Sequence, residues 1–187
     1  KNLLALVTAS FMEGFADRPL MDREILRERA AGIIAIIPSF AGDIQNALAA
    51  NQDEAAGALF AEYESIFGKD NVAILPSLLN LGGVLSDAGK HDEARVPLER
   101  ALALSEAKQG ADNPMQANIL NNLAVIAQET GKLDEAMSMF ERSRKIMEAI
   151  KGPESADVVE AYLNEAVVLK RQKKLADAVA LEHRILP

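Results

Sequence analysis

The second half of the chain repeats itself at intervals of 42 residues, and this period constrains the fold more than any other feature of the sequence. Gly89-Lys90 recurs as Gly131-Lys132, and Asp92-Glu93-Ala94 recurs as Asp134-Glu135-Ala136. Three glycines keep the same spacing, at Gly68, Gly110 and Gly152. Separate landmarks that share one ungapped period are typical of a solenoid, in which each repeat packs only against its neighbours.

Each repeat is predicted to be a pair of helices. In the first clear repeat, apolar residues recur once per helical turn, at Leu78, Leu81 and Leu85. This pattern predicts a helix over 75–88, which Gly89 would end because glycine readily adopts the left-handed conformation of a helix C-cap. A second helix is predicted from near Asp92, whose charge suits a helix N-terminus, to about Gln109.

Small side chains occupy matched positions of both helices. They are Gly82, Ala124 and Ala166 in the first helix, and Ala94, Ala136 and Ala178 in the second. Small residues let the two helices of a hairpin approach closely, and the larger Leu98 and Phe140 would fill the space between successive hairpins. The pattern therefore predicts an all-α fold.

The composition excludes several classes of protein. The chain has 187 residues, no cysteine and a net charge of −8. Without cysteine there can be no disulfide scaffold, thiolate nucleophile or cysteine-ligated metal. The acidic balance argues against nonspecific nucleic-acid binding, which needs a basic face. The apolar run 33–37 is far shorter than the roughly 20 residues that a membrane-spanning helix needs.

The two clear repeats resemble the tetratricopeptide repeat, whose helices alternate large and small residues at fixed positions. The matching residues of the first repeat are Leu78, Leu81, Gly82, Leu85, Ala94, Leu98 and Ala101. The second repeat has Leu120, Leu123, Ala124, Ala127, Ala136, Phe140 and Ser143 in the same positions. The 42-residue length, the turn 131–136 and the Asp112-Asn113-Pro114 linker are similar to the kinesin-light-chain type of this repeat.

This resemblance implies a right-handed α-α superhelix of antiparallel helix pairs, a tetratricopeptide solenoid. We expect repeats at 74–115 and 116–157, and a truncated one at 158–187. In the last repeat Glu165 replaces a leucine, Lys173 replaces the turn glycine and Glu182 replaces a large residue. These departures are interpreted as an end repeat with a wetter face, or as a face that meets a missing neighbour. The short last helix indicates truncation, and the sequence is expected to be a fragment or a processed form.

Residues before 74 match the pattern only in part. Ala56, Leu59, Phe60 and Tyr63 align with the second helix of the next repeat, so 38–73 is interpreted as a degenerate repeat-like helix pair. Residues 1–37 show no convincing repeat and are expected to form an N-terminal helical extension.

Catalytic patterns were sought and none was found. The two histidines, His91 and His183, have no metal-ligating partner at helical spacing, and there is no phosphate-binding glycine loop or nucleophile elbow. The abundant carboxylates are expected at helix starts and on exposed faces. The prediction is therefore that the chain is not an enzyme, with no metal and no cofactor.

By the resemblance, first-helix residues line a concave groove that holds a peptide. Carried over by position, the groove candidates are Asn80, Asp87, Asn118, Asn121, Asn122, Val125, Gln128, Glu129, Glu160, Asn164, Val167, Lys170 and Arg171. Asp87, Glu129 and Glu160 would favour a neutral to basic segment.

One asparagine per repeat forms a ladder at Asn80, Asn122 and Asn164. Asparagine is a poor helix residue, so its recurrence needs a reason. Its amide can pair with a peptide backbone, or it can bond the adjacent hairpin and hold the superhelical pitch. Both alternatives stay open at this point.

The leading hypothesis is a protein–protein interaction scaffold that binds a peptide or partner domain in the groove, within a larger bacterial protein. The alternatives are a structural spacer that associates through its exposed repeat ends into a homo-oligomer, and a regulatory domain of a fused enzyme. We expect a protein partner, no nucleic acid, no membrane span and a cytoplasmic location, with an exported compartment left open.

Overall fold

The computed structural model describes residues 46–47, 57–61, 64–65, 68–110 and 112–185. The chain divides into two compact units, 1–77 and 78–187. A short 3-10 helix, Val72–Ile74, precedes the first long helix. The long helices are α5 (Leu75–Asp87), α6 (His91–Gln109), α7 (Pro114–Glu129), α8 (Leu133–Lys151), α9 (Ala156–Arg171) and α10 (Leu175–Ile185).

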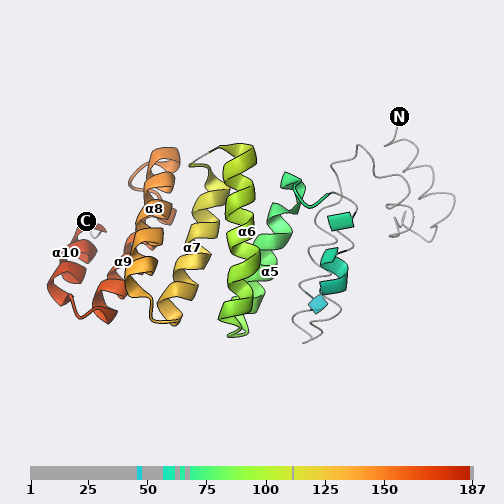
Figure 1. Ribbon diagram of the computed structural model, residues 1–187. Coiled ribbons are helices and arrows are strands. Elements are labelled where there is room, and N and C mark those ends of the chain that lie inside the picture. The colour runs from blue at the N-terminus through green and yellow to red at the C-terminus, as the bar shows by residue number, and fades with distance from the viewer. Residues whose placement is uncertain (1–45, 48–56, 62–63, 66–67, 111, 186–187) are drawn as a thin grey trace, which may run out of the picture. The chain divides into compact units, whose positions relative to one another are not determined.

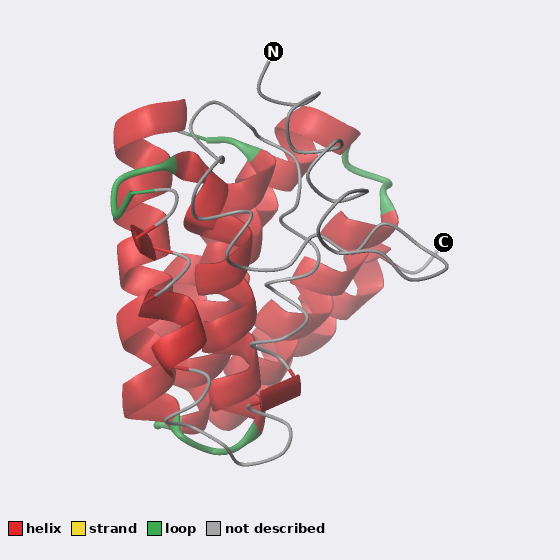
Figure 2. Cartoon of the chain, turned by 90° about the vertical axis from the view of Figure 1, so that its right-hand side faces the viewer, coloured by secondary structure: helices red, strands yellow, loops and turns green. Residues whose placement is uncertain are grey.

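These helices confirm the predicted all-α solenoid. In the part of the chain that is described, helices are joined by short loops and strands are absent (Figure 2). The predicted helices 75–88 and 92–109 correspond to α5 and α6 within one residue at each end. None of the described helices is both long and apolar enough to cross a membrane.

Successive helices pack against each other along the second unit, from α6 to α10 (Figure 1). One buried cluster joins Leu120 of α7, Ile146 of α8 and Tyr162 of α9. A second joins Ala127 of α7, Phe140 of α8 and Val168 of α9. Each cluster therefore contains one hairpin and the first helix of the next, which is the nearest-neighbour packing of a repeat protein.

The small residue at Gly82 is required by the packing of α5 on α6. A Cβ atom placed on Gly82 would lie 2.3 Å from Cγ of Leu98, which is fully buried. A Cβ atom on the neighbouring Gly83 would meet nothing within 4 Å. Close packing therefore explains Gly82 but not Gly83.

The turn within each hairpin uses a left-handed residue. Gly89 and Gly131 have φ values of 75° and 79°, and Lys173 takes the same place in the last repeat with φ 63°. The glycine-to-lysine change therefore keeps the turn, although a residue with a Cβ atom is strained in this conformation.

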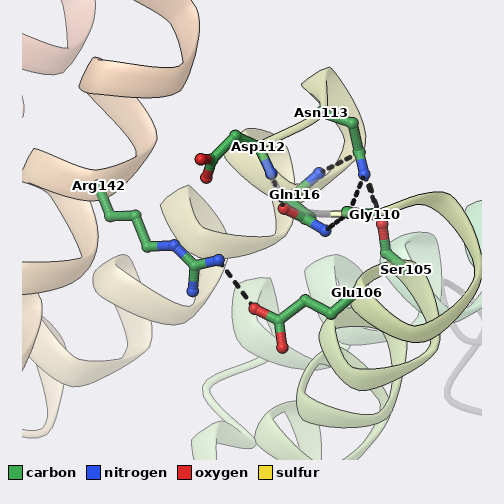
Figure 3. Close-up of polar contacts among 7 residues, drawn as sticks. All are labelled: Ser105, Glu106, Gly110, Asp112, Asn113, Gln116 and Arg142. Atoms are coloured by element: carbon green, nitrogen blue, oxygen red, sulfur yellow. Dashed lines mark hydrogen bonds and ion pairs between the residues drawn. The ribbon is translucent and has the colours of Figure 1, made fainter.

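The connection between α6 and α7 is fixed by side-chain hydrogen bonds (Figure 3). Gln116 is fully buried, and its Nε2 donates to the carbonyl oxygen of Gly110 at 2.7 Å. Its Oε1 accepts from the backbone N–H of Asp112 at 2.7 Å. Asn113 caps α7 by accepting from the N–H of Gln116, and its Nδ2 donates to Ser105 Oγ at 3.1 Å. These bonds satisfy polar groups that would otherwise be costly to bury.

The N-terminal expectations fall mainly outside the described residues. The helical extension 1–37 lies wholly outside them. Of the degenerate pair 38–73, the described residues 46–47, 57–61 and 64–65 are helical. The proposed boundaries of these segments stay a prediction.

Candidate functional site

The first helices of the hairpins, α5, α7 and α9, carry all the candidate groove residues, and we call their shared surface the first-helix face. None of the candidates is buried. Asn80, Asp87, Asn118, Glu129, Glu160, Val167, Lys170 and Arg171 are exposed, and Asn121, Asn122, Val125, Gln128 and Asn164 are half-buried.

Three of the candidates come together around a cavity between α7, α8 and α9. Asn118, Asn121 and Glu160 line it, and its volume is about 140 Å³. The remaining lining residues, which sequence reasoning missed, are Ser143, Met147, Asp157 and Ala161. The 42-residue alignment alone could not find them, because it does not show which residues of different helices meet.

Most polar groups at this cavity have partners within the protein. The buried Ser143 donates from Oγ to the carbonyl oxygen of Ala117 at 2.8 Å. Lys151 Nζ donates to Asp157 Oδ2 at 2.7 Å, and this hydrogen bond lowers the pKa of Asp157. Glu160 differs, since no ion pair to it occurs in the described part of the chain.

The asparagine ladder is not uniform. Asn164 Nδ2 donates to Oδ1 of Asn121, one hairpin away, at 3.3 Å. This is the geometry of the structural alternative, a bond to the adjacent hairpin. Within the described residues, the side chains of Asn80 and Asn122 make no hydrogen bond, and Asn80 is exposed whereas Asn122 is half-buried.

The C-terminal ends of α7 and α9 are joined by an arginine. Arg171 donates to the carbonyl oxygen of Gln128 at 3.0 Å and to Glu129 Oε1 at 2.8 Å. A hydrogen bond from Gln128, and after it the bond from Arg171, lowers the pKa of Glu129. Lys170 pairs with Glu182. The charges of Glu129, Lys170 and Arg171 are therefore paired with other residues of the array.

A buried polar network lies at the α8–α9 junction. Arg144 Nε donates to Glu165 Oε1 at 2.6 Å, and Arg144 Nη1 donates to Glu148 Oε2 at 3.0 Å. The Arg144 guanidinium lies 4.5 Å from the ring centre of Tyr162, and the Arg184 guanidinium lies 5.3 Å from it. Burial raises the pKa of Glu165, and the hydrogen bond from Arg144 opposes part of this effect.

This network corrects the interpretation of Glu165 as part of a wetter end face. The Glu165 side chain is 4% exposed. It is tolerated in the core because Arg144 supplies an opposite charge, without which a buried carboxylate would be very costly. The signal was available in the sequence, because Arg144 and Glu165 both stand where the preceding repeat has leucine, at Leu102 and Leu123.

Comparisons with known proteins agree with this architecture. Two family models, each described as tetratricopeptide repeat, match residues 77–114 and 115–186. The crystal structure of BtubC (BKLC) from P. vanneervenii is similar over 98% of this chain and 70% of that chain, with a TM-score of 0.65 and 19% sequence identity. That likeness shows the fold.

The N-terminal segment matches a different family. Residues 1–74 match the PHP domain model. The DNA polymerase III alpha subunits of Saccharopolyspora erythraea and Thermus aquaticus are each 38% identical to this chain, over 71 and 68 residues. The matches cover 38% and 36% of this chain, but only 6% of each relative.

These matches contradict the prediction that the chain is not an enzyme, since residues 1–74 match the PHP domain model and part of the chain is similar to DNA polymerase III alpha subunits. The sequence contained no catalytic motif that could have signalled it. The helices, the repeat models and the structural neighbour agree over the remainder of the chain. Residues 77–186 thus consist of tetratricopeptide repeats, and they directly follow a segment that matches the PHP domain model.

Proposed function

We propose that the repeat array binds a peptide segment of a partner protein on the first-helix face. The observation that carries this proposal is the polar cavity between α7 and α9, which opens among three residues selected by position alone, Asn118, Asn121 and Glu160. A concave site with a few convergent polar groups is the usual form of a binding site.

The charges on this face favour a neutral to basic segment. Asp87 and Glu160 are exposed acids, whereas Arg171 neutralises Glu129. Electrostatic complementarity of this kind speeds association and selects against acidic partners.

The array is further proposed to bring its partner to a polymerase-type region, of which residues 1–74 would form part. The support is that the PHP match ends at residue 74 and the repeat match begins at residue 77, so the two are adjacent in sequence. This arrangement corresponds to the alternative of a regulatory domain of a fused enzyme.

The experiment is a screen of a random peptide library with the full chain. A variant with Asn118→Ala and Glu160→Gln is screened beside a control with Ser138→Ala and Asp177→Asn. Both lose one negative charge at exposed positions, but the control changes lie on α8 and α10. Peptides enriched by the parent and the control, and lost with the first variant, support the proposal. Equal enrichment by both variants refutes a role for the first-helix face.

Self-association is a second candidate, favoured by one observation. Four large apolar side chains of the last hairpin are 41–62% exposed, and they are Leu163, Val167, Leu175 and Val179. Exposed apolar side chains gathered on one hairpin are a feature of interaction surfaces. A mass that rises with concentration in light scattering, and falls in Leu163→Ser/Val179→Ser, supports this function. A constant monomer mass excludes it.

A further inference from the structure

The cavity between α7 and α9 has the size of a side chain rather than of a whole ligand. Its volume is about 140 Å³. A protein cavity of about 150 Å³ holds one benzene molecule, so this cavity has room for the end of one long side chain. The lining comes from three helices, with Asn118 and Asn121 on α7 and Glu160 on α9.

The hydrogen-bonding groups around the cavity are mainly acceptors. Ser143 Oγ gives its proton to the carbonyl oxygen of Ala117, which leaves its lone pairs for an incoming donor. Ser143 is 5% exposed, so this hydroxyl lies deep in the protein. The Glu160 carboxylate and the side-chain oxygen of Asn118 add acceptors on two sides.

The charges around the cavity also favour a ligand that donates hydrogen bonds. Its only charged lining residues among those described are Asp157 and Glu160. Lys151 already pairs with Asp157, so Glu160 is the carboxylate left for a ligand. Met147 and Ala161 provide an apolar wall, against which the methylene groups of a long cationic side chain can pack.

This polar lining is particular to one junction and is not a general property of the repeat. One repeat earlier, the positions of Asn121 and Asp157 are occupied by Leu79 and Met115. The position of Ser143 is occupied there by an alanine. Asn121, Asp157 and Ser143 are therefore additions to the repeat pattern, and the position of Glu160 changes from an amide, Asn118, to a carboxylate.

We propose that this cavity is a subsite for a single lysine side chain of the bound peptide, an assignment that rests on the proposed function. The lysine ammonium would donate to Glu160, Asn118 and Ser143, because it carries three donors on a compact head. Arginine is less suited, since its planar fork needs carboxylates placed for two parallel bonds.

The test titrates the full chain, labelled with 15N, with acetyl-Ala-Ala-Lys-Ala-Ala-amide. Matched peptides carry norleucine, arginine or acetyl-lysine in place of lysine. The lysine peptide is expected to shift amide signals of α7 and α9, and to bind about tenfold more tightly than the norleucine peptide, the usual effect of a charge-assisted hydrogen bond. The variant Glu160→Gln should remove this difference, and the control Asp177→Asn should keep it.

The outcomes separate this assignment from the proposed function. Equal binding of the lysine and norleucine peptides on α7 and α9 overturns the lysine subsite but leaves peptide binding intact. Equal binding of lysine and acetyl-lysine also overturns it, because acetylation removes the charge. If neither peptide shifts α7 and α9, the subsite is wrong, and the library screen decides separately whether the face binds any peptide.

Discussion

Arg144 and Glu165 form a buried ion pair across the α8–α9 junction, with Nε and Oε1 2.6 Å apart. In the preceding repeat the same two positions hold Leu102 and Leu123, and Leu123 is 2% exposed. The same two positions are therefore filled by apolar side chains at the α6–α7 junction and by opposite charges at the α8–α9 junction.

This difference predicts strongly coupled substitutions. Arg144→Leu alone should lower the free energy of unfolding by about 3–5 kcal/mol, because it leaves the Glu165 carboxylate buried without its ion-pair partner. The double variant Arg144→Leu/Glu165→Leu should recover most of the loss, as it recreates the leucine pair of the preceding junction. Denaturant unfolding of the parent, both single variants and the double variant measures the coupling. Additive losses would contradict this account.

The two adjacent glycines of α5 predict substitutions of opposite sign. Gly82→Ala should lower the free energy of unfolding by about 1–3 kcal/mol, because the new methyl group overlaps the buried Leu98. Gly83→Ala meets open space and should raise stability by about 0.5–1 kcal/mol through its better helix propensity. Thermal unfolding of the two variants is the comparison, and losses of similar size would contradict the packing described.

Lys173 has a left-handed backbone conformation, so a glycine should be more stable than lysine at this turn. Lys173→Gly should stabilise the last hairpin by about 0.5–1 kcal/mol, because it relieves the strain of a positive φ. Lys174→Gly removes the same charge without that relief and serves as the control. Amide hydrogen exchange in α9 and α10 measures the effect, and slower exchange in the control alone would oppose the prediction.

The ion pair between Arg95 and Glu135 predicts a pH-dependent contribution. The hydrogen bond from Arg95 lowers the pKa of Glu135. The pair therefore adds stability above the ordinary carboxyl pKa of about 4.3, and loses it as the pH falls through the lower pKa of the folded state. At pH 7, Glu135→Gln should cost about 0.2–1 kcal/mol, as partly exposed pairs do. Urea unfolding of the parent and of Glu135→Gln at a series of pH values should show that the difference in their free energies of unfolding vanishes in acid. A difference that grows in acid would contradict this account.

Helices and turns were predictable because their signals are local. The spacing of Leu78, Leu81 and Leu85 and the left-handed glycines determine where α5 and α6 begin and end. Contacts across a junction depend on the direction in which each side chain leaves its helix. This direction turns by about 100° around the helix axis from one residue to the next. Asn164 therefore meets Asn121 rather than the ladder residue Asn122, a difference that spacing could not show.

The N-terminal segment was harder to predict from the sequence, for a different reason. The apolar residues Ala56, Leu59, Phe60 and Tyr63 have the spacing of any amphipathic helix, so their agreement with the repeat carries little family information. The PHP match spans the same residues and was not signalled by any motif considered.

The central claim is that a partner binds the first-helix face, and hydrogen–deuterium exchange tests it most directly. The full chain is compared with and without a peptide enriched in the library screen. The account predicts slower exchange on the exposed amides of α7 and α9, centred on 118–121 and 157–161. Protection confined to α6 and α8, with α7 and α9 unchanged, would contradict it.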